Sequence, residues 1–219
     1  MKIVSFNIGN FIWITYTDGA PHYAFQTKDI DAVTSLIKNE DADIIFLQEI
    51  ASDADAELLC QYFLDLPYSF KIKTSAYATS LFLSKFPIKE IHHTQSNDYE
   101  INGITFFPIH LYAFSPKVRL EQTKLLLSDV PEKRGVILGD TNFWIYNSFF
   151  FSKHDKSSYD MITRNYKDCL SHLGETHRTR LSLDKIFITP DLHASKVKIV
   201  KHKIGSIDHY LISAILSPV

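Results

Sequence analysis

Cysteine is scarce in this chain of 219 residues: Cys60 and Cys169 are the only two, and they lie far apart in the sequence. A disulfide framework or a structural zinc site is therefore not expected, and a reducing compartment is the inference. An excess of charge is also missing, since 23 basic and 25 acidic side chains leave a net charge of −2. No global positive field marks a nucleic-acid binder, so any polyanion has to be held locally.

Long apolar runs are missing as well. No window of about 18 apolar residues could span a membrane, and Asn7 and Asn10 interrupt the apolar N-terminal stretch before it reaches the length of a signal-peptide core. We therefore expect a cytoplasmic protein, although secretion without a cleaved signal would leave no trace in the sequence. The motifs G-x-S-x-G, G-x-x-x-x-G-K-[ST] and G-x-G-x-x-G are absent, which argues against a serine nucleophile, a P-loop and a dinucleotide-binding fold.

Enough apolar material is present for a large core. Hydrophobic residues make up 45% of the chain and aromatic residues 13%. Neither an internal repeat nor a low-complexity linker interrupts the sequence, so we expect one domain over residues 1–219. No feature calls for an obligate protein partner, and a monomer is expected.

Short apolar runs predict strands, because each is rich in β-branched or aromatic residues and too short for a buried helix. These runs are KIVSFNI (2–8), DIIFLQE (43–49), TSLFLS (79–84), ITFFPIHLY (104–112), GVILGD (135–140), LDKIFIT (183–189) and YLISAIL (210–216). Between two of them, LSKFPIKEI (83–91) predicts a hairpin, with Pro87 bounding a strand.

Three segments predict helices: residues 27–40, 52–66 and 115–129. Ser52 and Ser115 stand where N-caps are favoured, and Pro116 suits a first helical position. The first helix has an apolar stripe of Ile30, Val33, Leu36 and Ile37, and the third has one of Val118, Leu120, Leu125 and Leu126. Because strands outnumber the helices that could cover a single sheet, we expect an α/β fold of two packed mixed sheets with helices outside.

Polar side chains interrupt or end these strands, where α/β folds place their sites. They are Asn7, Glu49, His110, Asp140, Asn142, Asp184, Asp208 and His209. Each alone has an ordinary explanation: a turn residue, a helix cap or a satisfied core histidine. Together, their carboxylate and amide oxygens suit Mg²⁺, or Mn²⁺ as a substitute, better than zinc. Histidines beside such a cation suit hydrolysis of a phosphate ester by in-line attack of water.

The order of these motifs resembles the endonuclease/exonuclease/phosphatase superfamily. This group includes deoxyribonucleases, apurinic endonucleases, neutral sphingomyelinases, inositol polyphosphate 5-phosphatases and tyrosyl-DNA phosphodiesterase. The matching segments are SFNI (5–8), DIIFLQE (43–49), TSLFLSKFPI (79–88), HL with RLEQ (110–122), ILGDTN (137–142), LDKIFI (183–188) and SIDHYLI (206–212). The resemblance implies a four-layer α/β sandwich of two mostly antiparallel mixed sheets flanked by helices, with the active site where the strand ends of the two sheets meet.

The resemblance also implies roles for the polar residues. Asn7 and Glu49 match metal ligands, and Asp208 contributes to the metal shell or to a second ion. Asp140 matches the carboxylate that orients or deprotonates the attacking water, and Asn142 the amide that holds this water or a phosphate oxygen.

The remaining matches concern the phosphate and the leaving group. His209, paired with Asp184, matches the imidazole that stabilises the phosphate, and His110 matches a second imidazole that contacts phosphate or assists the leaving group. Pro108 and Ile207 depart from the usual residues beside these histidines. Arg180 and Tyr77 are further candidates for phosphate contact, although a solvated arginine and a strand-edge tyrosine are the ordinary alternatives.

The substrate stays open between three classes. The GDTN variant slightly favours the tyrosyl-DNA phosphodiesterase branch. The basic runs HRTR (177–180) and KVKIVKHK (196–203) could line a path for the phosphates of a nucleic acid, or they could be the exposed faces of an edge strand. The aromatic run 143–151, which includes Trp144, and the segment 10–19 could stack bases, meet a membrane lipid or pack as core. A nuclease or DNA-end phosphodiesterase is therefore the first expectation, a lipid or phosphoinositide enzyme the second, and a non-catalytic binding protein the third.

Overall fold

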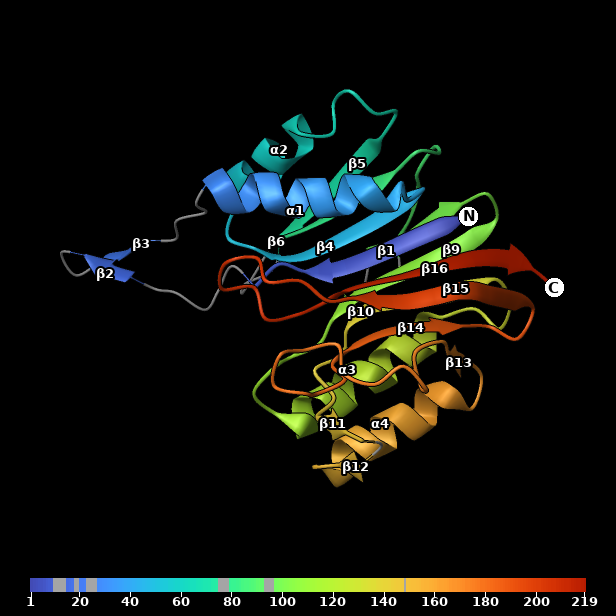
Figure 1. Ribbon diagram of the computed structural model, residues 1–219. Helices are drawn as coiled ribbons and strands as arrows, with labels where there is room; N and C mark the ends of the chain where they lie inside the picture. The colour runs from blue at the N-terminus through green and yellow to red at the C-terminus, as the bar shows by residue number, and fades with distance from the viewer. Residues whose placement is uncertain (10–14, 18–19, 23–26, 75–78, 93–96, 148) are drawn as a thin grey trace.

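A computed structural model describes residues 1–9, 15–17, 20–22, 27–74, 79–92, 97–147 and 149–219. Two six-stranded sheets pack against each other, with two helices outside each of them (Figure 1). The α/β sandwich expected from the sequence is confirmed. Among the described residues, no helix is long and apolar enough to cross a membrane.

The first sheet carries the two N-terminal helices on its outer face (Figure 1). In sheet order its strands are β15 (Leu192–Val200), β16 (Leu211–Pro218), β1 (Lys2–Asn7), β4 (Ile44–Ile50), β6 (Thr79–Ser84) and β5 (Ser69–Thr74). The helices are α1 (Thr27–Glu40) and α2 (Asp53–Gln61). Strand β1 is parallel to β4 and antiparallel to β16, so it lies in the interior of the sheet. Helices cover one of its faces and the second sheet covers the other, which is why its sequence is a near-continuous apolar run.

The second sheet is covered by the other two helices, α3 (Pro116–Asp129) and α4 (Lys153–Thr163). In sheet order its strands are β13 (Lys167–Asp168), β14 (Asp184–Ile188), β10 (Gly135–Asp140), β9 (Ile104–His110), β8 (Asn97–Ile101) and β7 (Lys89–His92). Strands β9 and β10 are parallel, and the other pairs of this sheet are antiparallel. Two small hairpins form separate two-stranded sheets: β2 (Thr15–Thr17) with β3 (Ala20–His22), and β11 (Ile145–Tyr146) with β12 (Phe149–Phe150).

The main core lies between the two sheets. Phe46 and Phe82 of the first sheet meet Tyr99 and Phe106 of the second, with ring centroids 4.5 Å apart for Phe82 and Tyr99. The apolar stripe of α1 buries Ile30, Val33 and Ile37 against the outer face of the first sheet, as predicted, and Leu36 is partly buried there. The two sheets are thereby fixed against each other, and with them the ends of their strands.

Two local predictions were wrong. Residues 83–91 do not form a hairpin, since β6 pairs within the first sheet and β7 within the second, and the segment carries the chain from one sheet to the other. Only half of the predicted stripe of α3 faces the core: Leu120 and Leu126 are half-buried, whereas Val118 and Leu125 are 42% and 44% exposed. The fully buried residues of the helix are Arg119 and Thr123. A buried ion pair between Arg119 and Asp155 of α4 sets this orientation.

Ser52 caps α2, as the sequence predicts, although the helix ends at Gln61 rather than at residue 66. Its hydroxyl accepts a hydrogen bond from the Asp55 backbone N–H at 3.1 Å. We expect Ser52→Ala to lower the free energy of unfolding by about 1 kcal/mol, because that N–H loses its partner. Urea denaturation measures the change. Ser157→Ala in the interior of α4 is the control, and an equal loss in both variants would contradict the capping role.

Candidate active site

Strand register brings the predicted polar residues to one end of the sandwich. In the second sheet Asp140 stands opposite His110 of β9 and Asp184 of β14, so these three side chains form a row across three strands. In the first sheet Asn7 ends β1, and Glu49 lies near the end of the neighbouring, parallel β4. Residues from distant parts of the chain therefore converge because their strands end together.

A glycine precedes Asp140 for a steric reason. A Cβ added to Gly139 would lie 2.0 Å from the backbone oxygen of Ile109 on the neighbouring parallel strand. Only glycine permits this approach of β9 to β10. The GD pair is thus a requirement of the sheet as well as of the site.

Hydrogen bonds fix Asp140 from several sides. Its Oδ1 accepts the Asn142 backbone N–H at 2.7 Å, and its Oδ2 accepts the Asn7 amide N–H at 3.0 Å. Its own backbone N–H donates to Gln48 Oε1 at 2.7 Å, across the gap between the two sheets. Asn142 has a left-handed φ of 50° and donates its side-chain amide to the Leu111 carbonyl. The carboxylate is completely buried and oriented by both sheets.

Glu49 reaches the same point through an irregularity of its strand. The register of β4 against β6 shifts between Leu47 and Ile50, and Glu49 has a φ of 58°. A bulge of this kind redirects a side chain and is enriched beside functional sites. Glu49 Oε1 consequently accepts the Asn7 amide at 2.9 Å and lies 3.2 Å from His110 Nε2.

Two imidazoles flank the Asp140 carboxylate. His209 Nδ1 is bonded to Asp184 Oδ2 at 2.9 Å, which directs Nε2 to a position 3.8 Å from Asp140 Oδ2. His110 Nε2 lies 3.9 Å from the same oxygen. Both separations exceed a direct hydrogen bond, and an oxygen of water or of a substrate could bridge them.

Burial and charge shift the pKa values of these groups. Burial lowers the pKa of His209, but the charges of Asp184 and Asp140 outweigh it and raise that pKa to about 10. Burial also lowers the pKa of His110, while its bond to Glu49 and the charge of Asp140 raise it, with a net rise. Burial raises the pKa of Asp140. In the protein without metal, His209 is therefore an imidazolium at neutral pH, beside a carboxyl group whose basicity is increased.

His177 belongs to the site although sequence reasoning placed it only in a basic run. Its Nε2 lies 3.0 Å from Asp208 Oδ2, its Nδ1 is bonded to Thr179 Oγ1, and its ring meets that of His209 at a centroid distance of 4.6 Å. An isolated β-bridge joins His177 to His209. A single bridge outside the strands leaves no periodic pattern in the sequence, so His177 could not be predicted as a site residue from apolar periodicity.

The site residues fall into three groups of possible metal ligands within the described part of the chain. They are Glu49, His110 and Asp140; Asp140, Asp184 and His209; and His177, Asp208 and His209. Asp208 is thus grouped with His177 rather than with Glu49. The Oδ1 atoms of Asp184 and Asp208 are buried without a hydrogen-bond partner. Buried carboxylate oxygens in this state fit a site that receives a cation.

Among the described residues, the remaining ones predicted to contact the substrate are not part of the groups around Asp140. Arg180 is exposed on the loop that follows His177. Tyr77 lies outside the described residues, as does most of the segment 10–19. The aromatic run divides: Phe143 and Ile145 are core residues, whereas Trp144, Phe149 and Phe151 are 47%, 63% and 58% exposed. Of the second basic run, residues up to Val200 belong to β15, an edge strand, which agrees with the ordinary explanation.

Known structures share this architecture at low sequence identity. The 3′ phosphatase NExo from Neisseria, bound to product DNA hairpin, matches with a TM-score of 0.73 and 14% identity over 99% of both chains. TDP2 from D. rerio, complexed with single strand DNA product, matches with a TM-score of 0.69 and 16% identity over 99% of this chain and 98% of that one. An AP endonuclease from Archaeoglobus fulgidus matches with a TM-score of 0.67 and 16% identity over 98% of both chains.

No curated protein sequence matches the chain significantly. A family model does: the model described as Endonuclease/Exonuclease/phosphatase family matches residues 4–206, which contain all four helices and, apart from β16, strands of both sheets. The chain therefore belongs to the endonuclease/exonuclease/phosphatase family and is a phosphoric ester hydrolase.

Proposed function

We propose that the protein hydrolyses a phosphodiester of nucleic acid, or the phosphate at a DNA end, in a Mg²⁺-dependent reaction. One observation carries this proposal: the buried Asp140 carboxylate faces two imidazoles, His110 and His209, across gaps that a substrate oxygen or water could fill. This arrangement offers a proton acceptor and cationic donors around one point.

Asn7 and Glu49 would hold Mg²⁺, with Mn²⁺ as a substitute, since their oxygens suit a hard cation. Asp208 is grouped with His177 rather than with Glu49, and it would hold a second ion. When bound, the ion would neutralise charge on the phosphate and polarise its P–O bonds. Two further observations support this ligand set. Asp208 has a buried oxygen without a hydrogen-bond partner, and Glu49 is turned into the site by its strand bulge.

The protein's own groups divide the reaction between them. Asp140 takes a proton from the attacking water, and its raised pKa favours this role. Asn142 keeps Asp140 oriented through its backbone N–H. His209, held by Asp184, donates Nε2–H to an oxygen of the phosphate. The water oxygen bonds to phosphorus as the ester P–O bond breaks, and His110 protonates the leaving oxygen.

Similar structures support nucleic acid as the substrate. The Neisseria and D. rerio proteins were both solved with product DNA, and their folds cover nearly the whole of this chain. The net charge of −2 gives no general attraction to DNA, so binding would rest on local groups such as the exposed Arg178 and Arg180. Trp144 is exposed two residues after Asn142 and could stack a base.

A specific observation favours a lipid phosphodiester as the second candidate. Phe149 and Phe151 are both well exposed, and their rings contact each other at a centroid distance of 5.5 Å. Together with Trp144 they give the loop after Asn142 exposed aromatic surface that could enter a lipid interface.

A substrate screen tests the proposal. Plasmid DNA, a 3′-phosphorylated oligonucleotide, a tyrosyl-DNA oligomer, sphingomyelin vesicles and phosphoinositide vesicles are each incubated with the protein in Mg²⁺, in Mn²⁺ and in EDTA. We expect cleavage of a DNA substrate in Mg²⁺, weaker or equal cleavage in Mn²⁺ and none in EDTA. Cleavage of the vesicles alone would establish the lipid alternative. If no substrate were cleaved, or if cleavage persisted in EDTA, the proposal would fail.

A further inference from the structure

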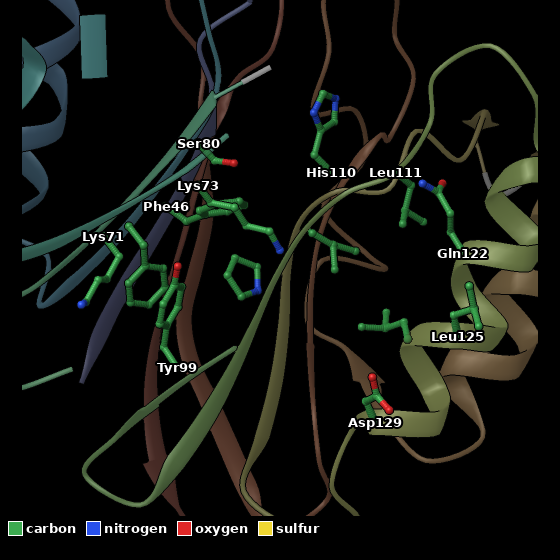
Figure 2. A pocket seen from close by; sticks show the side chains of 14 residues that line it. Phe46, Lys71, Lys73, Ser80, Tyr99, His110, Leu111, Gln122, Leu125 and Asp129 are labelled. Carbon is green, nitrogen blue, oxygen red and sulfur yellow. The ribbon is translucent and has the colours of Figure 1, made fainter. Parts of the chain in front are cut away.

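A cavity of about 360 Å³ opens beside His110, and residues of β4, β5 and β6 in the first sheet and of β8, β9 and α3 line it (Figure 2). Phe46, Phe82 and Pro108 form apolar parts of its wall. His110, which contacts Glu49, also lines the cavity, and its side chain is 24% exposed. The cavity is therefore continuous with the candidate active site.

Three polar side chains face this cavity without a partner in the described structure: Lys73 of β5, Ser80 of β6 and Tyr99 of β8. Neither the Lys73 ammonium nor the hydroxyl groups of Ser80 and Tyr99 form a hydrogen bond or ion pair with another described residue. All three groups donate hydrogen bonds, and one carries a positive charge. Polar groups kept unpaired in a partly buried pocket are arranged for a ligand rather than for the fold.

The neighbouring lysine behaves differently. Lys71 also lines the cavity but forms an ion pair with Glu90, and in Figure 2 its ammonium points away from that of Lys73. Asp129 of α3 also lines the cavity, and its Oδ2 is buried without a hydrogen-bond partner, but it lies on the far side of β9 in the same view. Burial lowers the pKa of Lys73, against a smaller rise due to Asp98. Of the two lysines that line the cavity, Lys73 is thus the one without an ion pair to a described residue.

We propose that Lys73, Ser80 and Tyr99 bind a second phosphate group of the substrate, next to the one that is cleaved. The inference rests on the proposed function, since it places the cleaved phosphate beside Asp140 and His209 and the second phosphate on the other side of His110. A compact ammonium and two hydroxyl donors suit a phosphate monoester. The apolar wall suits the sugar or carbon ring that joins the two phosphates. The second phosphate could be the end of a nucleic acid strand or part of a small molecule.

Calorimetric titration in EDTA separates binding from cleavage. Two probe pairs distinguish the sources of the phosphate: a thymidine dinucleotide with and without a 5′-terminal phosphate, and inositol 1,4-bisphosphate against inositol 1-phosphate. We expect the wild-type protein to bind the member with the extra phosphate about 10-fold more tightly in at least one pair. Lys73→Gln is expected to remove most of this preference, and Tyr99→Phe a smaller part.

Lys89→Gln is the matched control, because Lys89 is exposed on β7 and pairs with Glu100. It is expected to keep the full preference. A preference in the dinucleotide pair alone identifies a strand end, and one in the inositol pair alone identifies a small molecule. The inference is overturned if the extra phosphate gives no gain in either pair, or if both Lys73→Gln and Tyr99→Phe retain the gain. A preserved preference without any cleavage in Mg²⁺ would refute the proposed reaction and leave this subsite standing.

Discussion

Asp140→Asn is expected to lower kcat about 10³-fold on whichever phosphate ester the screen identifies, with little change in stability. The amide has nearly the shape of the carboxylate, and its oxygen can still accept the Asn142 N–H. It cannot take a proton from water, and it lacks the charge that faces His110 and His209. General base catalysis contributes about 10²–10⁴-fold in enzymes. Asp140 is completely buried, and it is the carboxylate that belongs to two of the three groups of candidate metal ligands.

The effect is measured as kcat and KM under Mg²⁺, with the thermal unfolding midpoint of each variant as a check on folding. Asp65→Asn is the matched control: Asp65 is exposed and pairs with Lys38, and it belongs to none of the three groups. It should leave kcat unchanged. A folded Asp140→Asn protein with kcat within about threefold of the wild type would rule out Asp140 as the proton acceptor.

The strands of the site could be read from the sequence because burial on both faces leaves a continuous apolar run. Strands β6 and β10 begin and end at the predicted residues, and each of the other five predicted runs overlaps a strand whose bounds differ from the prediction by at most two residues at either end. A polar residue at the end of such a run has no ordinary place in a core. For this reason Asp140 and His209 could be predicted as site residues from the sequence alone.

What could not be predicted depends on contacts between distant segments. Helix α4 lacks an apolar stripe, because its buried face contains Asp155 and Ser158, and the rule of apolar periodicity fails there. The redirection of Glu49 depends on a bulge against β6, and His177 enters the site through a single bridge to His209. In each case the decisive partner is about 30 residues or more away, outside the reach of local patterns.

Arg119→Met is expected to lower the free energy of unfolding by about 3–5 kcal/mol, the usual cost of removing one member of a buried ion pair. Arg119 is completely buried and bonds both Asp155 oxygens, at 2.8 Å each. It also donates to the carbonyls of Tyr112 and Ala113, which follow His110 in the chain. Methionine fills much of the volume but leaves the Asp155 charge buried and uncompensated. Urea denaturation followed by far-UV circular dichroism measures the loss.

The double variant Arg119→Met with Asp155→Leu separates charge from packing. If the uncompensated carboxylate causes the loss, removing it should recover a large part of the stability, because an apolar pair can replace a buried ion pair at little cost. Arg164→Met, at the exposed end of α4, is the control and should change stability by less than about 0.5 kcal/mol. A double variant no more stable than Arg119→Met would instead assign the loss to the hydrogen bonds on Tyr112 and Ala113. The Arg119 guanidinium would then chiefly stabilise the backbone at Tyr112 and Ala113, just after His110, rather than the contact between α3 and α4.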